Sequence, residues 1–195
     1  MTRRQFIKSV IATGVVSFSG PLFARPAGAG PKATPGSVER LITLRVNGQK
    51  RPVDVMPQET LAQTLRDKLG LTGLKIGCDR AECGACTVLI DDVPRYSCSI
   101  LTHSVRGKNI LTIEGLARPD GGLHPLQQGA LDSQAFQCGY CAPGFVMATL
   151  GYLKTNPAPT RQELAHGISG NLCRCQDYDK ILTGLLRGAE YMRKG

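Results

Sequence analysis

The sequence contains no tryptophan, and aromatic residues make up only 5% of its 195 residues. Proteins that bind single-stranded nucleic acid stack the bases on aromatic side chains, so this composition disfavours that class. The chain also has no G-x-G-x-x-G fingerprint after a strand, and therefore no nucleotide-binding or flavin-binding motif. It holds only three scattered histidines. Its length allows one or two compact domains.

Acidic residues are absent from the first 37 residues, which carry five basic ones: Arg3, Arg4, Lys8, Arg25 and Lys32. The whole chain has a formal net charge of +9. The residues that follow this segment hold 19 basic and 15 acidic side chains and no basic run. Because the excess charge is concentrated in one short segment, we expect no nucleic-acid partner.

This N-terminal segment has the organisation of an export signal. A charged start is followed by a weakly apolar stretch over residues 9–24 and by the small residues Ala27-Gly28-Ala29. The stretch is broken by Gly, Ser and Pro and is shorter than the about 20 residues of a transmembrane helix. We therefore expect cleavage after Ala29 and no stable membrane span afterwards. An uncleaved signal that anchors the protein is the alternative.

The pair Arg3-Arg4, followed by Gln-Phe-Ile-Lys, resembles the twin-arginine (Tat) signal of bacteria. The resemblance implies that the protein is exported already folded and is located in the periplasm. Residues 1–37 are then a signal peptide and flexible lead.

The next part of the chain predicts a small α+β domain over residues 38–117. Apolar residues alternate with polar ones on both sides of Asn47-Gly48, which is a strong hairpin signal. Residues 60–69 carry leucines at i, i+4 and i+8 and predict a helix. A glycine-rich loop follows, then a strand over residues 87–90, a turn at Asp91-Asp92 and, further along the chain, another short strand over residues 110–113.

Residues 118–195 predict only helices. A breaker over residues 118–122 separates this part from the first. Helices are expected over residues 124–136, over 144–153 after Pro143, from the capping box that starts at Thr160, and over 179–192. Four short helices of this kind form a bundle.

The eight cysteines divide evenly between these two parts. The first part holds a C-x4-C-x2-C-x11-C pattern, and the second pairs C-x2-C with C-x-C across 31 residues. Three chemistries compete for these thiols. Four disulfides would suit an exported chain. However, a protein exported already folded would have to fold before its cysteines could be oxidised to disulfides outside the cytoplasm. Structural zinc more usually uses paired C-x2–4-C knuckles.

An iron–sulfur site matches the first pattern directly, because C-x4-C-x2-C…C is the plant-type [2Fe–2S] spacing. Gly77 and Gly84 flank these cysteines and let backbone N–H groups approach a negatively charged cluster. No histidine stands at a ligand position, which excludes a Rieske centre.

Three motifs resemble one known family. They are CDRAECGACTV at residues 78–88, FQCGYCAPG at 136–144 and GNLCRC at 170–175. The chain is similar over residues 40–193 to the iron–sulfur small subunit of the molybdenum hydroxylases, the xanthine dehydrogenase and aldehyde oxidoreductase group. The Tat signal makes it most like the periplasmic aldehyde oxidoreductases.

The resemblance implies an N-terminal plant-ferredoxin-like β-grasp domain followed by an all-α four-helix-bundle domain, with one [2Fe–2S] cluster in each. It assigns the outer cluster to Cys78, Cys83, Cys86 and Cys98, and the inner cluster to Cys138, Cys141, Cys173 and Cys175. It also implies that Gln137 and Cys138 lie near the pterin of the partner subunit. No catalytic residue is expected in this chain.

The implied function is electron transfer within an oxidoreductase complex. Electrons pass from the molybdopterin centre of a large partner subunit through both clusters to an FAD-binding subunit or a cytochrome c, so molybdopterin, FAD or haem belong to partners only. The chain departs from the family at Ala142, where Thr is common, and at Gln176-Asp177-Tyr178, where Thr-Gly-Tyr is common. Tyr140 is expected to pack over the cluster or the partner.

Overall fold

A computed structural model describes residues 39–194 of the chain. The predicted signal peptide therefore lies outside the described residues. Within them, no helix has the length and apolar character needed to cross a membrane.

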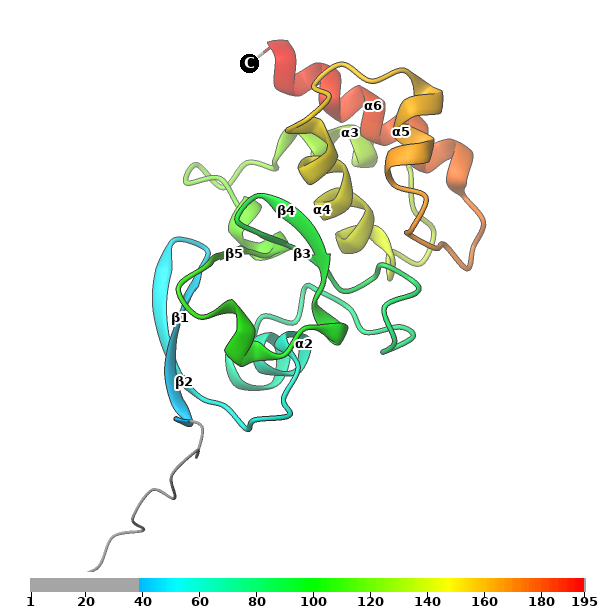
Figure 1. Cartoon of the computed structure of the whole chain (residues 1–195). Coiled ribbons are helices and arrows are strands. Elements are labelled where there is room, and N and C mark those ends of the chain that lie inside the picture. Colours follow the sequence, from blue (N-terminus) through cyan, green and yellow to red (C-terminus); the bar gives the residue numbers. More distant parts are fainter. Residues whose placement is uncertain (1–38, 195) are drawn as a thin grey trace, which may run out of the picture. The chain divides into compact units, whose positions relative to one another are not determined.

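The first part of the fold is a five-stranded mixed sheet in the order β2-β1-β5-β3-β4 (Figure 1). Its strands are β1 (Leu41–Val46), β2 (Gln49–Asp54), β3 (Thr87–Ile90), β4 (Val93–Tyr96) and β5 (Asn109–Leu111). The β1–β2 and β3–β4 pairs are antiparallel, and β1 pairs in parallel with β5.

Both hairpins turn where the sequence predicts. Asn47 and Gly48 have φ angles of 52° and 75°, and Asp91 and Asp92 have 48° and 66°. A two-residue turn with both φ angles positive matches the right-handed twist of the strands it joins. Thr87, the first residue of β3, lies opposite Tyr96, the last residue of β4. The residue before β3 and the residue after β4 are therefore brought side by side.

The predicted helix over residues 60–69 is present but is not wholly α-helical. Thr60 caps a short helix, α2 (Leu61–Gln63), and the chain continues as a π-helix, η1 (Thr64–Lys68). Leu61 and Leu65 are fully buried, as their spacing predicts. The leucine pattern reports which face is buried and not which backbone hydrogen bonds form.

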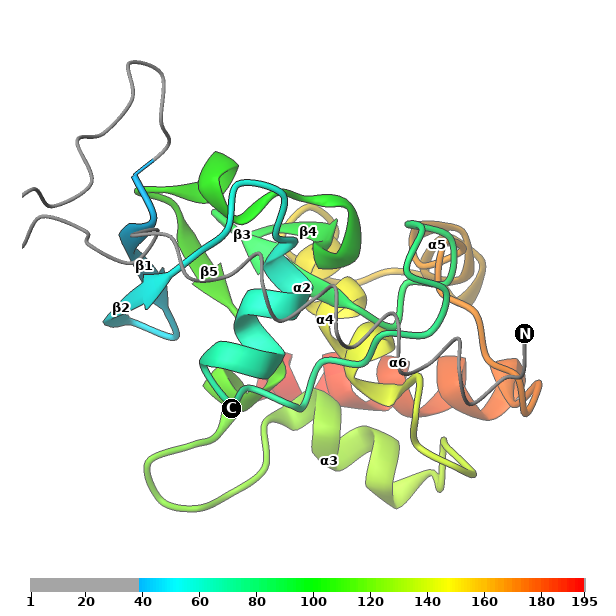
Figure 2. The same cartoon turned by 90° about the horizontal axis from the view of Figure 1, so that it is seen from below.

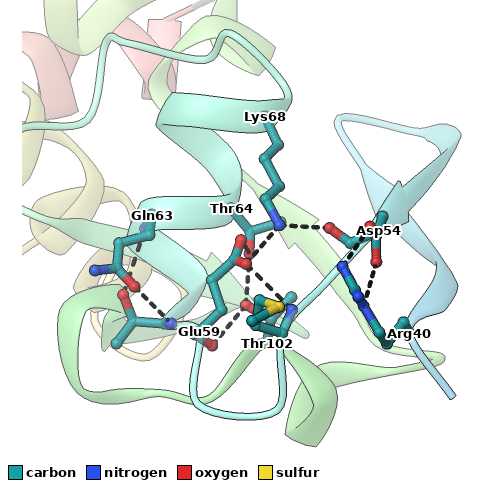
Figure 3. A network of polar contacts seen from close by, with 9 residues as sticks. Arg40, Asp54, Glu59, Gln63, Thr64, Lys68 and Thr102 are labelled. Carbon is teal, nitrogen blue, oxygen red and sulfur yellow. Dashed lines mark hydrogen bonds and ion pairs between the residues drawn. The ribbon is translucent and has the colours of Figure 1, made fainter. Parts of the chain in front are cut away.

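A buried carboxylate ties this helix to neighbouring loops (Figure 3). Glu59 accepts hydrogen bonds from Thr64 Oγ1 at 2.7 Å and from Lys68 Nζ. Thr102 donates its backbone N–H to the Glu59 carbonyl oxygen at 3.0 Å. Burial acts to raise the pKa of Glu59, but the hydrogen bonds from Lys68 and Thr64 hold it below its ordinary value of 4.5.

The second part consists of four helices, as predicted: α3 (Pro125–Asp132), α4 (Ala142–Leu153), α5 (Arg161–Gly167) and α6 (Tyr178–Lys194). The capping box at Thr160 is confirmed. Helix α3 is shorter than expected because the chain turns after Asp132, and Gln134 has a φ of 46°. Figure 2 shows α3 running beside α6.

Strand β3 is buried on both faces and joins the two parts. Val88 and Ile90 face the core beneath the sheet, whereas Leu89 belongs to the core of the helical part. Helix α4 covers this second face (Figure 1). Gly151 permits the approach, because a Cβ there would lie 2.5 Å from Pro94 Cγ. The expected α+β fold, a ferredoxin-like sheet followed by helices, is confirmed.

Candidate metal centres: two cysteine quartets

The loop before β3 wraps backbone amides around the first thiol. Cys78 Sγ accepts hydrogen bonds from the N–H groups of Arg80, Glu82 and Cys83 at 3.3–3.4 Å. Asp79 and Ala81 have φ angles of 53° and 61°. Left-handed backbone at these non-glycine residues is uncommon and turns the amides inward.

The β3–β4 hairpin brings the fourth cysteine of the first quartet to the other three. Cys86 precedes β3, and Cys98 follows β4 within η2 (Ser97–Ser99). Ser97 donates its hydroxyl to the Cys86 carbonyl oxygen at 2.7 Å. The backbone N–H of Ala81 donates to Cys98 Sγ at 3.3 Å. The 11 residues between Cys86 and Cys98 therefore form the hairpin that brings Cys98 back beside Cys86.

Hydrogen bonding and burial act differently on these thiols. Burial acts to raise the pKa of Cys78, but the three backbone N–H groups outweigh it and lower the value to about 7. Burial raises the pKa of Cys86 to about 12. Amides aimed at sulfur stabilise a thiolate, which is the form that binds a metal.

The second quartet lies between two helix starts. Cys138 and Cys141 precede α4, and Cys173 and Cys175 precede α6. The sulfur atoms of Cys138 and Cys175 are 3.6 Å apart. Burial, with the adjacent Cys173 thiol, raises the pKa of Cys141 to about 12. The N-termini of both helices carry partial positive charge, which favours an anionic group here.

These two sites fit [2Fe–2S] clusters by the chemistry of their donors. Each quartet offers only sulfur ligands, and all eight cysteines are free thiols. The 3.6 Å between Cys138 and Cys175 exceeds the about 2.05 Å of a disulfide. The structure brings the cysteines together in pairs: Cys78 with Cys83 and Cys86 with Cys98 in the first part, and Cys138 with Cys175 and Cys141 with Cys173 in the second. The assignment of these residues as cluster ligands stays a prediction.

Hydrogen bonds join the two quartets directly. Leu172, beside Cys173, donates its backbone N–H to the Cys83 carbonyl oxygen at 2.9 Å. Asn171, which is buried, donates its side-chain amide to the Gly84 carbonyl oxygen at 3.0 Å. Gly84 has a φ of 71°, and a Cβ on it would lie 2.5 Å from Asn171 Nδ2.

A cavity of about 470 Å³ opens along this contact and is lined by Cys138, Cys141 and Cys173 of the second quartet and by Cys83 of the first. Tyr140 spans it, since its hydroxyl donates to the Ile76 carbonyl oxygen at 2.8 Å. Sequence reasoning placed Tyr140 over a cluster or a partner but did not foresee this bond. It also missed Asn171, a polar residue inside the GNLCRC motif.

Gln137 is exposed at the rim of the second quartet, as a residue that contacts a partner must be. Its side-chain amide donates to Asp177 Oδ1 at 2.8 Å. Contact with a pterin stays a prediction for Gln137 and Cys138.

Two family models match the chain. One, described as a 2Fe-2S iron-sulfur cluster binding domain, covers residues 44–110, and the other, a [2Fe-2S] binding domain, covers residues 112–186. They bear out the prediction of two [2Fe–2S] clusters.

Among curated proteins, the chain is 44% identical over 154 residues to the nicotine 6-hydroxylase small subunit of Paenarthrobacter nicotinovorans, covering 78% of this chain and 92% of that one. It is 37% identical over 200 residues to the aldehyde oxidoreductase iron-sulfur-binding subunit of Escherichia coli K12, covering 95% and 86%. Among solved structures, quinoline 2-oxidoreductase from Pseudomonas putida 86 matches with a TM-score of 0.75 and 40% identity, covering 80% of this chain and 99% of that one.

Proposed function

Because the chain belongs to the iron–sulfur small subunits of the molybdenum hydroxylase family, we propose that it carries electrons from a molybdopterin centre in a large partner subunit to an acceptor. When bound, the two clusters take up and release single electrons. The chain itself is an oxidoreductase subunit, and the hydroxylation of substrate belongs to the partner.

The observation that carries this proposal is the direct contact between the quartets. The cavity beside the second quartet reaches Cys83 of the first, and the Leu172 N–H donates to the Cys83 carbonyl oxygen. Asn171 and Tyr140 add two further hydrogen bonds across the same contact. These bonds fix the separation of the two sites, on which the rate of electron tunnelling depends.

The exposed residues around Cys138 support the proposal that a partner subunit binds there and passes electrons to this chain. Cys138 is exposed, and the large side chains Tyr140, Leu172 and Tyr178 near it are 40–52% exposed. Exposed apolar residues grouped around an otherwise buried centre are typical of protein interfaces. We propose that the molybdopterin-binding subunit covers this surface and meets Gln137 and Cys138 there, and that electrons leave from the first quartet to an FAD-binding subunit or a cytochrome c.

The molybdopterin-binding partner subunit would determine which substrate is hydroxylated. The relatives are named for nicotine, nicotinate and aldehydes. We also propose periplasmic location after Tat export. The twin arginines and the small-residue site support it.

The experiment is purification of the complex from its host through a tag on this chain, followed by metal and cofactor analysis and by substrate addition without oxygen. We expect molybdenum to co-purify, two [2Fe–2S] clusters per chain, and the electron paramagnetic resonance (EPR) signals of both reduced clusters after an aldehyde or N-heterocycle is added. A complex without molybdenum, or clusters that such substrates leave oxidised while dithionite reduces them, would contradict the proposal.

A further inference from the structure

Asp177 places a carboxylate beside the second quartet. A carboxylate oxygen of Asp177 and the sulfur atoms of Cys173 and Cys175 all lie within 4.8 Å of one another. Asp177 Oδ1 accepts the hydrogen bond of 2.8 Å from Gln137 Nε2, which holds the carboxylate against the quartet.

Asp177 stands directly before α6, at the position where an N-cap residue would lie. Its carbonyl oxygen accepts the backbone N–H of Ile181 at 2.9 Å, as an N-cap residue does. Its side chain is used differently. Oδ1 pairs with Gln137, and Oδ2 is buried without a hydrogen-bond partner among residues 39–194. Within the same residues, Asp177 forms no ion pair. Its side chain is therefore neither a cap nor neutralised by a cation.

A negative charge close to a redox centre opposes the addition of an electron. The opposition is strong where the charge is half-buried, because solvent screens it poorly. We propose that Asp177 is a positioning residue for electron transfer, whose charge, held by Gln137, lowers the reduction potential of the inner cluster and so drives electrons toward the outer one. This inference rests on the proposed function, because it needs a cluster in the second quartet.

The test is an EPR-monitored redox titration of the purified complex carrying Asp177→Asn. Asparagine keeps the shape of aspartate and an oxygen that can accept the Gln137 hydrogen bond, and it replaces the second oxygen by a neutral NH2 group, so the charge is removed. We expect the equilibrium constant for reduction of the inner cluster to rise about tenfold, which is 59 mV for a one-electron couple. We expect the outer cluster to change less than about twofold.

Two further variants separate charge from structure. Asp177→Glu keeps the charge and is expected to stay within about twofold of the native potential. Asp179→Asn removes a charge of the same sign from the same segment, but the Asp179 side chain is 93% exposed and pairs with Arg161. We expect it also to stay within about twofold, since solvent screens an exposed charge.

The proposal is overturned if Asp177→Asn leaves the inner potential within about twofold of native, or if Asp179→Asn or Asp177→Glu shifts it equally. Loss of the inner EPR signal in Asp177→Asn would also overturn it, since Asp177 would then be needed to retain the cluster. Failure of the proposed function is distinguishable from all of these, because the native complex itself would then lack two reducible clusters.

Discussion

At the residue scale, the buried carboxylate of Glu59 is held by short hydrogen bonds from neighbouring side chains. Glu59 is only 8% exposed, and it replaces lost hydration with bonds from Lys68 and Thr64 (Figure 3). A buried carboxylate that loses its charge leaves its cation unpaired, which costs more than the bond itself contributes.

We expect Glu59→Gln to lower the free energy of unfolding by about 1–2 kcal/mol at pH 7, because Lys68 loses its anionic partner. The pKa of Glu59 is lowered in the folded protein, so its contribution is fully present above the ordinary value of 4.5 and is lost only as the pH falls through the folded value. The penalty should thus be constant between pH 6 and 8, where thermal unfolding of the native and variant proteins can be compared.

Glu39→Gln is the control, since the Glu39–Arg106 ion pair is exposed on both sides. We expect less than about 0.5 kcal/mol from it. An equal loss in the two variants, or a penalty at Glu59 that changes between pH 6 and 8, would refute this account of the buried pair.

Part of this residue-scale detail could be predicted from the sequence. The cysteine spacings divide the thiols into two sets of four, and the expected close approach at Gly77 is to a cysteine, since a Cβ there would lie 3.0 Å from Cys83 Sγ. At Gly84 the close neighbour is instead Asn171, which the sequence did not indicate. The left-handed backbone at Asp79 and Ala81 could not be predicted, because non-glycine residues adopt it only when their surroundings impose it. Nor could the pairing of Gln137 with Asp177, which are 40 residues apart and meet only through tertiary folding.

At the scale of elements, small residues decide how closely the helices pack. Gly129 of α3 faces Gly184 and Gly188 of α6, and a Cβ on Gly188 would lie 2.6 Å from Leu126 Cα. The two backbones therefore meet without side chains between them. This contact holds α6 in place, and α6 begins three residues after Cys175.

We expect Gly188→Ala to destabilise the protein by about 1–3 kcal/mol, because its methyl group overlaps the α3 backbone. The sign of the change in stability tests the packing, because replacing glycine by alanine in a helix without close neighbours stabilises the helix by about 1 kcal/mol. Glu190→Ala, at an exposed position of α6, is the matched control and should change stability by less than about 0.5 kcal/mol. Chemical denaturation measures both. An unchanged or raised midpoint for Gly188→Ala would show that the helices are not packed this closely.

Element type could largely be predicted from the sequence, and element ends less well. The Asn47-Gly48 hairpin and the Thr160 capping box are local signals that tertiary contacts leave intact. The π-helix at Thr64–Lys68 and the early end of α3 depend on backbone hydrogen bonds that side-chain periodicity does not encode. The pairing of β1 with β5 joins segments far apart in the sequence.

At the scale of the whole molecule, charge is unevenly distributed along the sequence. Five basic residues and no acidic ones lie in the first 37 residues, and the rest of the chain has a small positive excess.

We expect the double change Arg3→Lys and Arg4→Lys to retain the complex in the cytoplasm with both clusters, because the Tat pathway reads the arginine pair. Arg25→Lys, in the same leader but outside the pair, should leave export intact. Cell fractionation with immunoblotting measures both. Export of the double variant at the native level would exclude the Tat route.

The central claim is that each quartet holds its own cluster, and EPR of dithionite-reduced single-cysteine variants tests it most directly. We expect Cys138→Ala to lose one of two distinct signals and keep the other, and Cys78→Ala to show the reverse pattern. Loss of neither signal, loss of the same signal in both variants, or a colourless native protein with stoichiometric zinc would contradict the account.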